Sequence, residues 1–335
     1  MLGQVVEAAG SRVMRAIWVE DDALVWRETP TPVVRAGEVL IDIHASAVNR
    51  ADLMQRRGHY PPPPGASPIP GLECAGVVAE VGDGVSRLKI GDSVCALLAG
   101  GGYAEQTVVP DGQVLPIPAG FSFEQAAAVP EVFATAWLNL FMEAGLRQGE
   151  QVLIHAGASG VGTAGIQLCR VFGNPCYVTV GNAEKLRTCI RLGASGGSIR
   201  HDGRFVEQVT AWTGGSGFDV ILDPVGAAYL SDNLNSLCLN GRLVVIGLMG
   251  GMTANLDLRL LMMERLRVIG STLRSRPVAM KTAVMDALHH RVWPLLESGE
   301  IVPVIDRCFS VTEADAAHSR MAANANTGKL ILRIR

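Results

Sequence analysis

The residues of this chain whose type and spacing could do chemistry are first of all three glycines, Gly157, Gly160 and Gly162. They lie between an apolar segment, 152–155, and a stretch of helical periodicity, 160–172. Such glycines allow a tight turn, a close approach of backbone to pyrophosphate and close helix packing, while the first amides of the helix face the anion. The pattern predicts a dinucleotide site, and the alternative is a glycine-rich turn without a ligand. The residues assigned to it are Gly157, Ser159, Gly160, Val161 and Gly162.

The residues after the next apolar segment, 176–180, favour NADP(H) over NAD(H). Folds that select NAD(H) usually carry an acidic residue about twenty positions beyond the glycines, where it accepts hydrogen bonds from the ribose 2′-hydroxyl. Here the segment ends without a carboxylate, provided that Glu184 points away. Nearby amide and basic side chains would donate to a 2′-phosphate, and the alternative for the basic ones is solvated surface charge. The predicted contacts are Gly181, Asn182, Lys185 and Arg200.

A third loop, Gly247-Leu248-Met249, follows an apolar segment at the expected carboxyl edge of the same sheet. Ligands of open parallel sheets bind at that edge, so the backbone of Gly247, Leu248 and Met249 would meet the nicotinamide, with 223–226 lining the same crevice. We interpret His155, beside the glycines, as a packing residue and not as a base.

Histidines and cysteines are present but do not have the spacing of metal ligands. The chain holds 7 of each, without a C-x-x-C pair or a cysteine–histidine cluster. Zinc-dependent alcohol dehydrogenases need thiolate and imidazole ligands, because the metal polarises the alcohol oxygen. We therefore expect no catalytic metal, and we expect reduced cysteines and a cytoplasmic location.

Composition indicates a well-buried protein of two domains. The chain has 335 residues, of which 48% are hydrophobic and 18% charged. A net charge of −3 argues against nucleic-acid binding, and the longest apolar run is broken by glycines, which argues against a membrane span. Residues 1–13 lack the pattern of a secretory signal, and we expect them to form a mobile extension.

The elements that must position these residues change character along the chain. Residues 14–118 are strand-rich, with a helix over 50–57 and a stiff proline loop that holds Tyr60. Ser122 and Gln125 form the pattern of a capping box. Strands then alternate with helices, which predicts an α/β fold with a doubly wound parallel sheet. The expected strands lie over 152–155, 176–180, 219–222, 243–247 and 267–270, and the expected helices over 160–172, 184–192, 205–212 and 229–238. A helix over 277–298, a helix over 312–323 and a strand over 329–334 follow.

Five motifs resemble those of the zinc-free quinone oxidoreductases of the medium-chain dehydrogenase/reductase superfamily, in particular their tumour-suppressor-inducible branch. They lie at 45–56, 62–67, 71–73, 155–164 and 247–251. Zinc-dependent relatives carry a cysteine where this chain has Asn49 and a histidine where it has Leu72. The resemblance therefore implies a site without zinc.

The resemblance also implies an architecture and an assembly. It implies a GroES-like β-rich catalytic domain over 14–134 and 276–335, a Rossmann domain over 135–275, NADPH between them, and a homodimer that joins the Rossmann sheets edge to edge. Asn49 and Tyr60 match positions that face the substrate side of the nicotinamide, while Thr135 and Asn324 match cofactor contacts. Relatives commonly carry serine at Asn182 and tyrosine at Arg200, so this chain departs from the family around the 2′-phosphate.

These observations predict NADPH-dependent reduction of quinones by hydride transfer. Hydrogen-bond donors on Asn49 and Tyr60 would stabilise the oxygen that becomes negative, and water would supply the proton. One alternative is the reduction of activated alkenes, such as 2-enals or enoyl thioesters, with Tyr60 as the proton donor. Another is a non-catalytic NADPH-binding protein that acts as a redox sensor or structural partner.

Overall fold

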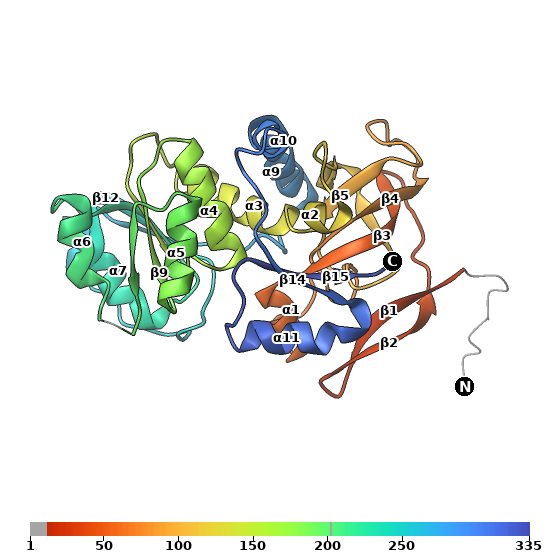
Figure 1. Ribbon diagram of the computed structural model, residues 1–335, viewed down its shortest axis with the longest axis horizontal. Helices are drawn as coiled ribbons and strands as arrows, with labels where there is room; N and C mark the ends of the chain where they lie inside the picture. Colours follow the sequence, from red (N-terminus) through yellow and green to blue (C-terminus); the bar gives the residue numbers. More distant parts are fainter. Residues whose placement is uncertain (1–11, 202) are drawn as a thin grey trace.

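The computed structural model describes residues 12–201 and 203–335, which form two lobes side by side (Figure 1). One lobe, green and cyan in Figure 1, contains a six-stranded sheet, and the other contains a seven-stranded sheet and a hairpin. Most of the extension expected at 1–13 lies outside the described residues. No helix in the described ranges is long and apolar enough to cross a bilayer.

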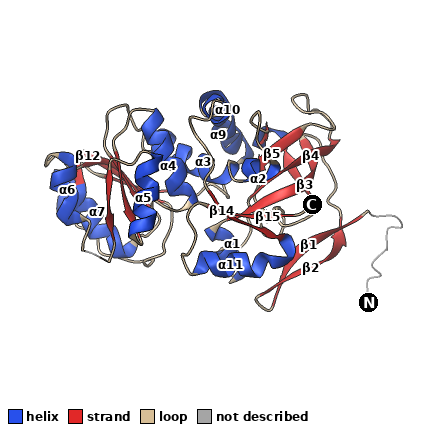
Figure 2. Ribbon diagram, in the orientation of Figure 1, coloured by secondary structure: helices blue, strands red, loops and turns tan. Residues whose placement is uncertain are grey.

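The six-stranded sheet is entirely parallel and has the strand order β10-β9-β8-β11-β12-β13. Helices cover both of its faces: α4 and α5 pack over one apolar cluster, α6 and α7 over another (Figure 2). This confirms the predicted doubly wound Rossmann domain. In chain order its elements are β8 (Val152–His155), α4 (Gly160–Val171), β9 (Cys176–Val180), α5 (Ala183–Leu192), β10 (Gly196–Ile199), α6 (Val206–Thr213), β11 (Phe218–Asp223), α7 (Leu230–Ser236), β12 (Leu237–Val245), α8 (Leu258–Met263) and β13 (Arg267–Gly270).

The other lobe confirms the expected GroES-like fold. Its sheet has the order β14-β15-β3-β4-β5-β7, with β6 also paired to β3, so a late strand of the chain pairs with an early one. The hairpin of β1 (Val13–Glu20) and β2 (Ala23–Pro30) packs beside it, as do α1 (Arg50–Arg56) and α11 (Ala314–Ala322). The strands of the sheet are β3 (Glu38–Val48), β4 (Glu73–Val81), β5 (Ser93–Leu97), β6 (Gln106–Pro110), β7 (Val114–Pro116), β14 (Ile305–Ser310) and β15 (Lys329–Arg333).

Helices between the lobes join the two parts into one core. They are α2 (Phe123–Ala127), α3 (Pro130–Trp137), α9 (Val278–Arg291) and α10 (Trp293–Glu297), and α3 continues into a π-helical segment, Leu138–Glu143. Ser122 caps α2 in the predicted capping box with Gln125. One apolar cluster contains Phe133 of α3, Leu168 of α4 and Ile331 of β15, and therefore connects both lobes.

Three elements differ from the sequence prediction. Strand β10 was not expected because it contains two glycines, but Gly197 is required there, since a Cβ atom would lie 2.7 Å from the Leu186 side chain. The helix expected over 277–298 is two helices, broken at Val292 before Pro294, which cannot donate a backbone hydrogen bond. Strand β14 lies where no strand was expected and pairs in parallel with β15.

Candidate functional site

The glycine loop between β8 and α4 has the form of an anion cradle. Its left-handed turn residue is Ala156, with φ of 54°, and not Gly157 as expected. A Cβ atom on Gly157 would instead lie 2.6 Å from Val178 of β9, and one on Gly162 would lie 2.4 Å from the Gly157 carbonyl oxygen. Both positions therefore require glycine, because a larger residue would clash with its neighbours.

The start of α4 combines a side-chain cap with a free backbone amide. Ser159 Oγ accepts a hydrogen bond from the Gly162 amide at 3.0 Å, so it caps the helix. Among the described residues no acceptor contacts the Val161 amide, which leaves this donor for a phosphate at the positive end of the helix, whereas the Gly160 amide faces Gly328 in the parallel bridge between Ser159 and Gly328. The Gly328 amide of the other lobe donates to Ala158 O at 2.8 Å. The cradle therefore lies at the junction of the lobes.

Cationic side chains gather at the end of β9, where a 2′-phosphate would lie. Lys185 Nζ donates to the backbone oxygen of Asn324 at 2.6 Å, and Arg50 Nη2 donates to its side-chain oxygen at 2.6 Å. The structure thus brings the predicted Lys185 and Asn324 together, and adds Arg50, which the sequence reasoning missed although it follows Asn49 directly. Burial lowers the pKa of Lys185. The negative charge of Asp306 opposes this effect, and the positive charge of Arg200 lowers the pKa further.

The backbone between these cations is open. A Cβ atom on Gly181 would have no neighbour within 4 Å, so a ribose would meet no side chain there. Asn182 uses its side-chain oxygen to cap α5 through the Lys185 amide at 2.9 Å, which leaves its NH2 group to donate. The Glu184 side chain is exposed to solvent. These residues therefore fit a phosphorylated ribose better than one with a free 2′-hydroxyl.

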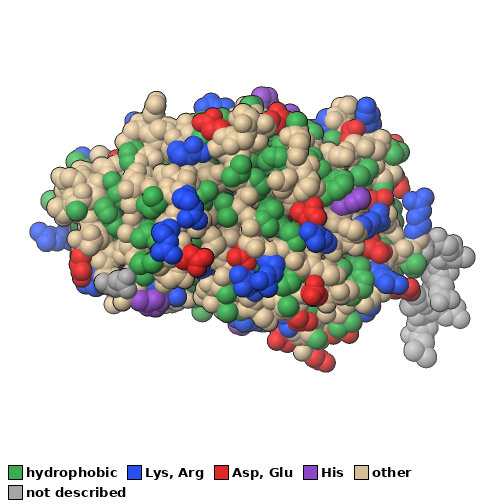
Figure 3. All heavy atoms as spheres, viewed as in Figure 1, with side chains coloured by type: hydrophobic (Ala, Val, Ile, Leu, Met, Phe, Trp, Pro, Cys, Tyr) green, Lys and Arg blue, Asp and Glu red, His purple; other side chains and the backbone are tan. Residues whose placement is uncertain are grey.

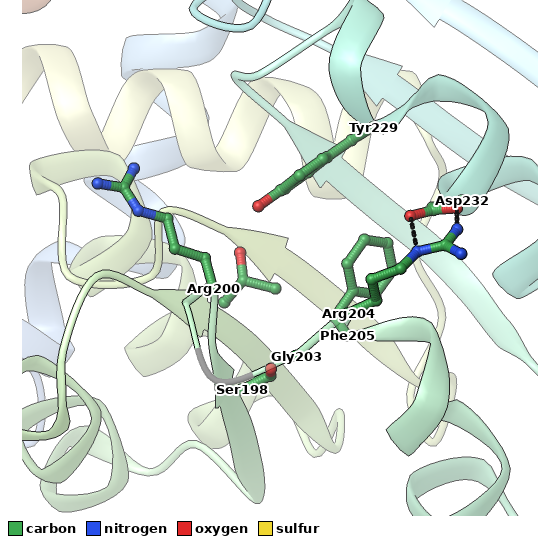
Figure 4. Close-up of a pocket in the computed structure, with 8 residues that line it drawn as sticks. Ser198, Arg200, Gly203, Arg204, Phe205, Tyr229 and Asp232 are labelled. Atoms are coloured by element: carbon green, nitrogen blue, oxygen red, sulfur yellow. Dashed lines mark hydrogen bonds and ion pairs between the residues drawn. The ribbon is translucent and has the colours of Figure 1, made fainter.

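Arg200 lines a small cavity of about 80 Å³ beside the same strand ends (Figure 4). The Tyr229 hydroxyl points into the space in front of Arg200, and the far wall holds the ion pair of Arg204 with Asp232 (Figure 4). Thr179 of β9 and Ser198 of β10 supply hydroxyl groups to the wall. Arg200 therefore has its guanidinium at the rim of a polar cavity next to Lys185.

Asn49 is part of a buried ionic network. Lys329 Nζ lies 2.6 Å from Glu73 Oε1 and 2.7 Å from Asn49 Oδ1, and its side chain is nearly inaccessible. The Asn49 amide donates to Glu73 at 2.9 Å and, more weakly, to Ala47 O at 3.4 Å. Its hydrogens are therefore engaged within the protein. Next to Asn49, the buried Asp52 carboxylate accepts hydrogen bonds from the backbone amides of Asn49 and Gly71.

Glu131, at the start of α3, links this network to Tyr60 and Thr135. Its backbone amide donates to Glu73 Oε2 at 2.8 Å, and its carboxylate makes a long contact of 3.5 Å with Thr135 Oγ1. Burial and the charge of Glu73 raise the pKa of Glu131 to about 8. Burial and Glu131 raise the pKa of Tyr60, whose hydroxyl has no hydrogen-bond partner among the described residues. Asn49 and Tyr60 share no direct hydrogen bond there.

The loop of Gly247, Leu248 and Met249 packs against the loop after β11. The Met249 amide donates to Pro224 O at 3.2 Å, and the Leu248 and Met249 side chains are about half exposed. His155 is buried and bonds Thr179 at 2.9 Å and Asn233 at 2.6 Å, and burial lowers its pKa to about 4. The latter geometry confirms a packing role.

At the two positions where the resemblance implies zinc ligands in zinc-dependent relatives, this chain has Asn49, whose side chain is engaged in the ionic network, and Leu72, which is buried and apolar. Within the described ranges, no three His, Cys, Asp or Glu side chains are grouped so that they could hold a metal ion.

Comparisons with known proteins agree with this architecture. A model of the alcohol dehydrogenase GroES-like domain matches residues 35–119, and a model of the zinc-binding dehydrogenase family matches residues 160–289. Quinone oxidoreductase of Rattus norvegicus is 31% identical over 97% of this chain and 99% of its own. The structure of Escherichia coli quinone oxidoreductase complexed with NADPH is similar with a TM-score of 0.83 and 28% identity, over 97% of this chain and 100% of that one.

The structure of CurK enoyl reductase is also similar, with a TM-score of 0.84 and 26% identity over 96% of this chain and 99% of that one. Both the sequence relative and the solved structures extend over nearly the whole chain, so they include both sheets and the junction between them. The chain belongs to the medium-chain dehydrogenase/reductase superfamily of oxidoreductases.

Proposed function

We propose that this protein reduces quinones with NADPH by hydride transfer and without zinc, as a member of the tumour-suppressor-inducible branch. The observation that carries the proposal is the ionic network at Asn49, where the ammonium of Lys329 bonds the amide and Glu73. An amide that is hydrogen-bonded to an ammonium and to a carboxylate stands there in place of a thiolate, so the position offers no free ligand to a divalent metal. The curated relative named above is a quinone oxidoreductase.

NADP(H) is the proposed cofactor because the residues present fit its phosphates. The Val161 amide of α4 and the cluster of Lys185, Arg200 and Arg50 supply donors for anions at two separate places. We assign the remaining contacts with the cofactor to Thr135 and to the loop 247–249. A bound nicotinamide would supply the hydride, and the protein would hold it against the acceptor.

Tyr60 is the donor that we assign to the acceptor oxygen. Its hydroxyl is unengaged, whereas the amide hydrogens of Asn49 are used by Glu73 and Ala47. A hydroxyl that bonds the oxygen as it becomes negative lowers the barrier, because the interaction strengthens in the transition state. Asn49 then acts by shaping the wall behind the substrate.

The direct test measures NADPH oxidation with 1,4-benzoquinone and with 9,10-phenanthrenequinone. We expect rapid turnover that is unchanged by a metal chelator and by added zinc, and a preference for NADPH over NADH. Absence of turnover with both quinones, or loss of activity on chelation that zinc restores, contradicts the proposal.

Reduction of an activated alkene is the second candidate, and the similarity to CurK enoyl reductase favours it. Here Tyr60 would give a proton to the α-carbon, so Tyr60→Phe should abolish reduction of a 2-enal while only weakening quinone turnover. A protein that binds NADPH tightly but reduces neither acceptor would fit the third alternative, a redox sensor or structural partner.

We also propose that the protein is located in the cytoplasm, where its cysteines stay reduced. A further proposal is that the chain forms a homodimer through β13. β13 lies at the edge of the sheet with Val268 42% exposed, and Met262 and Met263 of the preceding α8 are 69% and 60% exposed. An apolar edge of this kind is suited to pairing with another strand. Sedimentation should show that Val268→Lys lowers the mass to that of one chain, whereas Ile90→Lys, at an exposed site of the other lobe, leaves it unchanged. A monomeric wild type refutes this assembly.

We place the boundaries of the two domains at 14–134 with 276–335 and at 135–275. The segment 271–277 leaves β13 of the Rossmann sheet and leads to α9, so it crosses between the proposed domains. Limited proteolysis that first cuts near 135 or 275 would support these limits, and cuts confined to other loops would contradict them.

A further inference from the structure

We propose that Arg274 is a positioning residue for Tyr60: it fixes the loop that carries the ring and lays a positive charge against the ring face. The proposal rests on the proposed function, in which the Tyr60 hydroxyl bonds the acceptor. Arg274 lies in the segment between β13 and α9, and the sequence offered no motif that singled it out.

The guanidinium of Arg274 joins three parts of the catalytic lobe. Nε donates to Ala99 O, just beyond β5, at 2.7 Å, and Nη2 donates to Gln55 Oε1 of α1 at 2.7 Å. Nη1 donates to the backbone oxygen of Tyr60 at 3.3 Å. A single side chain from the Rossmann side thus fixes the start of the proline loop to a helix and to a strand end.

The same guanidinium also faces the aromatic ring. Its central carbon lies 5.4 Å from the centroid of the Tyr60 ring, which is within the range of a cation–π contact. Arg274 is only 4% exposed, so this charge is poorly screened by solvent. A ring fixed at its backbone and at its face has few orientations left, which is what a directed hydroxyl donor needs.

The charge of Arg274 is unusual because it is buried without an ion pair, although the negative charges of Asp52 and Glu131 act on it from farther away. All three acceptors are neutral, and no carboxylate forms an ion pair with Arg274 among the residues described. Lys281 of α9 adds a second buried cation, whose Nζ donates to Arg274 O at 3.4 Å. A buried cation that is kept without an ion pair is better explained by an effect on its neighbours than by stability.

Tyr60 therefore lies between charges of opposite sign. Arg274 lowers the pKa of Tyr60, while burial and Glu131 raise it. Removal of the positive charge should raise the pKa of the phenol, and removal of the negative charge should lower it. This opposition provides two variants whose effects must differ in sign.

The first experiment follows the phenol directly and needs neither cofactor nor substrate. The four tyrosines are replaced by 3-fluorotyrosine, and Tyr60→Phe assigns the fluorine resonance of Tyr60. Relative to the wild type, we expect the pKa of Tyr60 to rise in Arg274→Met and to fall in Glu131→Gln. A pKa of Tyr60 that is the same in the wild type and Arg274→Met overturns the electrostatic part of the proposal.

The second experiment separates positioning from folding. Arg274→Lys keeps the charge but cannot make the three-way contact, so it should lower kcat with quinone by roughly 10- to 100-fold while the KM for NADPH stays within about twofold. In the Tyr60→Phe background the same change should have little further effect, because both act through one hydroxyl. Additive losses in the double variant refute the coupling.

Gln55→Ala removes only one of the three acceptors of Arg274, and it replaces Arg274→Met in the experiment if that variant does not fold. It should broaden or shift the Tyr60 fluorine resonance, and a resonance identical to the wild type counts against the clamp. The two proposals fail separately. A wild type that does not reduce quinones contradicts the proposed function, whereas the fluorine titration tests the role of Arg274 in either case.

Discussion

Replacement of Lys329 by Met should destabilise the protein strongly, because it leaves the Glu73 carboxylate buried without its cation. The Lys329 ammonium lies 2.6 Å from Glu73, 2.7 Å from Asn49 Oδ1 and 3.1 Å from Val48 O, and the residue is 2% exposed. Removal of one partner from a buried ion pair costs about 3–5 kcal/mol of the free energy of unfolding. Since Met keeps most of the apolar volume, a cavity contributes little to this loss.

The assay is urea unfolding of the protein without cofactor, followed by circular dichroism. The double variant Glu73→Gln with Lys329→Met tests the reasoning, because it removes both charges and should recover part of the stability. Arg333→Met, on the same strand but in an exposed ion pair with Glu124, should lose no more than about 1 kcal/mol. A loss below about 1 kcal/mol for Lys329→Met, or a double variant no more stable than the single one, would show that the ion pair is not responsible.

Three further predictions concern the cofactor site and pH. Lys185→Glu should raise the KM for NADPH roughly 10- to 100-fold, because it removes one charge-assisted hydrogen bond to the 2′-phosphate, and should change the KM for NADH little. Arg187→Glu, on the same helix, should change neither KM. Equal losses for both cofactors contradict the assignment. Gly162→Ala should weaken NADPH binding in fluorescence titrations because its Cβ would lie 2.4 Å from a carbonyl oxygen of the glycine loop, and an affinity equal to that of the wild type would contradict this. His155 is held neutral by burial and has a pKa of about 4, so as pH falls below about 6.5 the unfolded chain takes up its proton first and the free energy of unfolding decreases until about pH 4. In His155→Gln that decrease should be smaller in urea unfolding, and an unchanged slope would exclude this residue as its source.

The elements with strong local patterns were predictable from the sequence. The bounds of β8, β9 and β13 match the predicted segments to the residue, because each is a short apolar or β-branched run between clear turns. The strand Gly196–Ile199 was not predictable, since its glycines disfavour a strand locally and its pairing with β9 determines it. The break at Val292 depends on one proline and on packing between the lobes.

The candidate site was predictable where neighbours in sequence form it, as in the glycine loop. It was not predictable where residues from distant segments meet. In the sequence, Lys329 is only the first residue of an expected strand and Glu73 only the last residue of a motif. Their pairing depends on β15 lying beside β3. Arg50 and Arg274 carry no periodic signal, and their roles depend on contacts with Asn324 and Tyr60.

The position of β15 beside β3 has a consequence for how the protein is made. A ribosome synthesises the early strands of the GroES-like sheet first, then the whole Rossmann segment, and only then Gly328 and Lys329, which complete the cradle and neutralise Glu73. Until then the nascent chain carries an open sheet edge and an unpaired acidic group, which favours transient association with a chaperone. Newly made chains should therefore acquire affinity for the nicotinamide cofactor late and in one step, once β15 has been made.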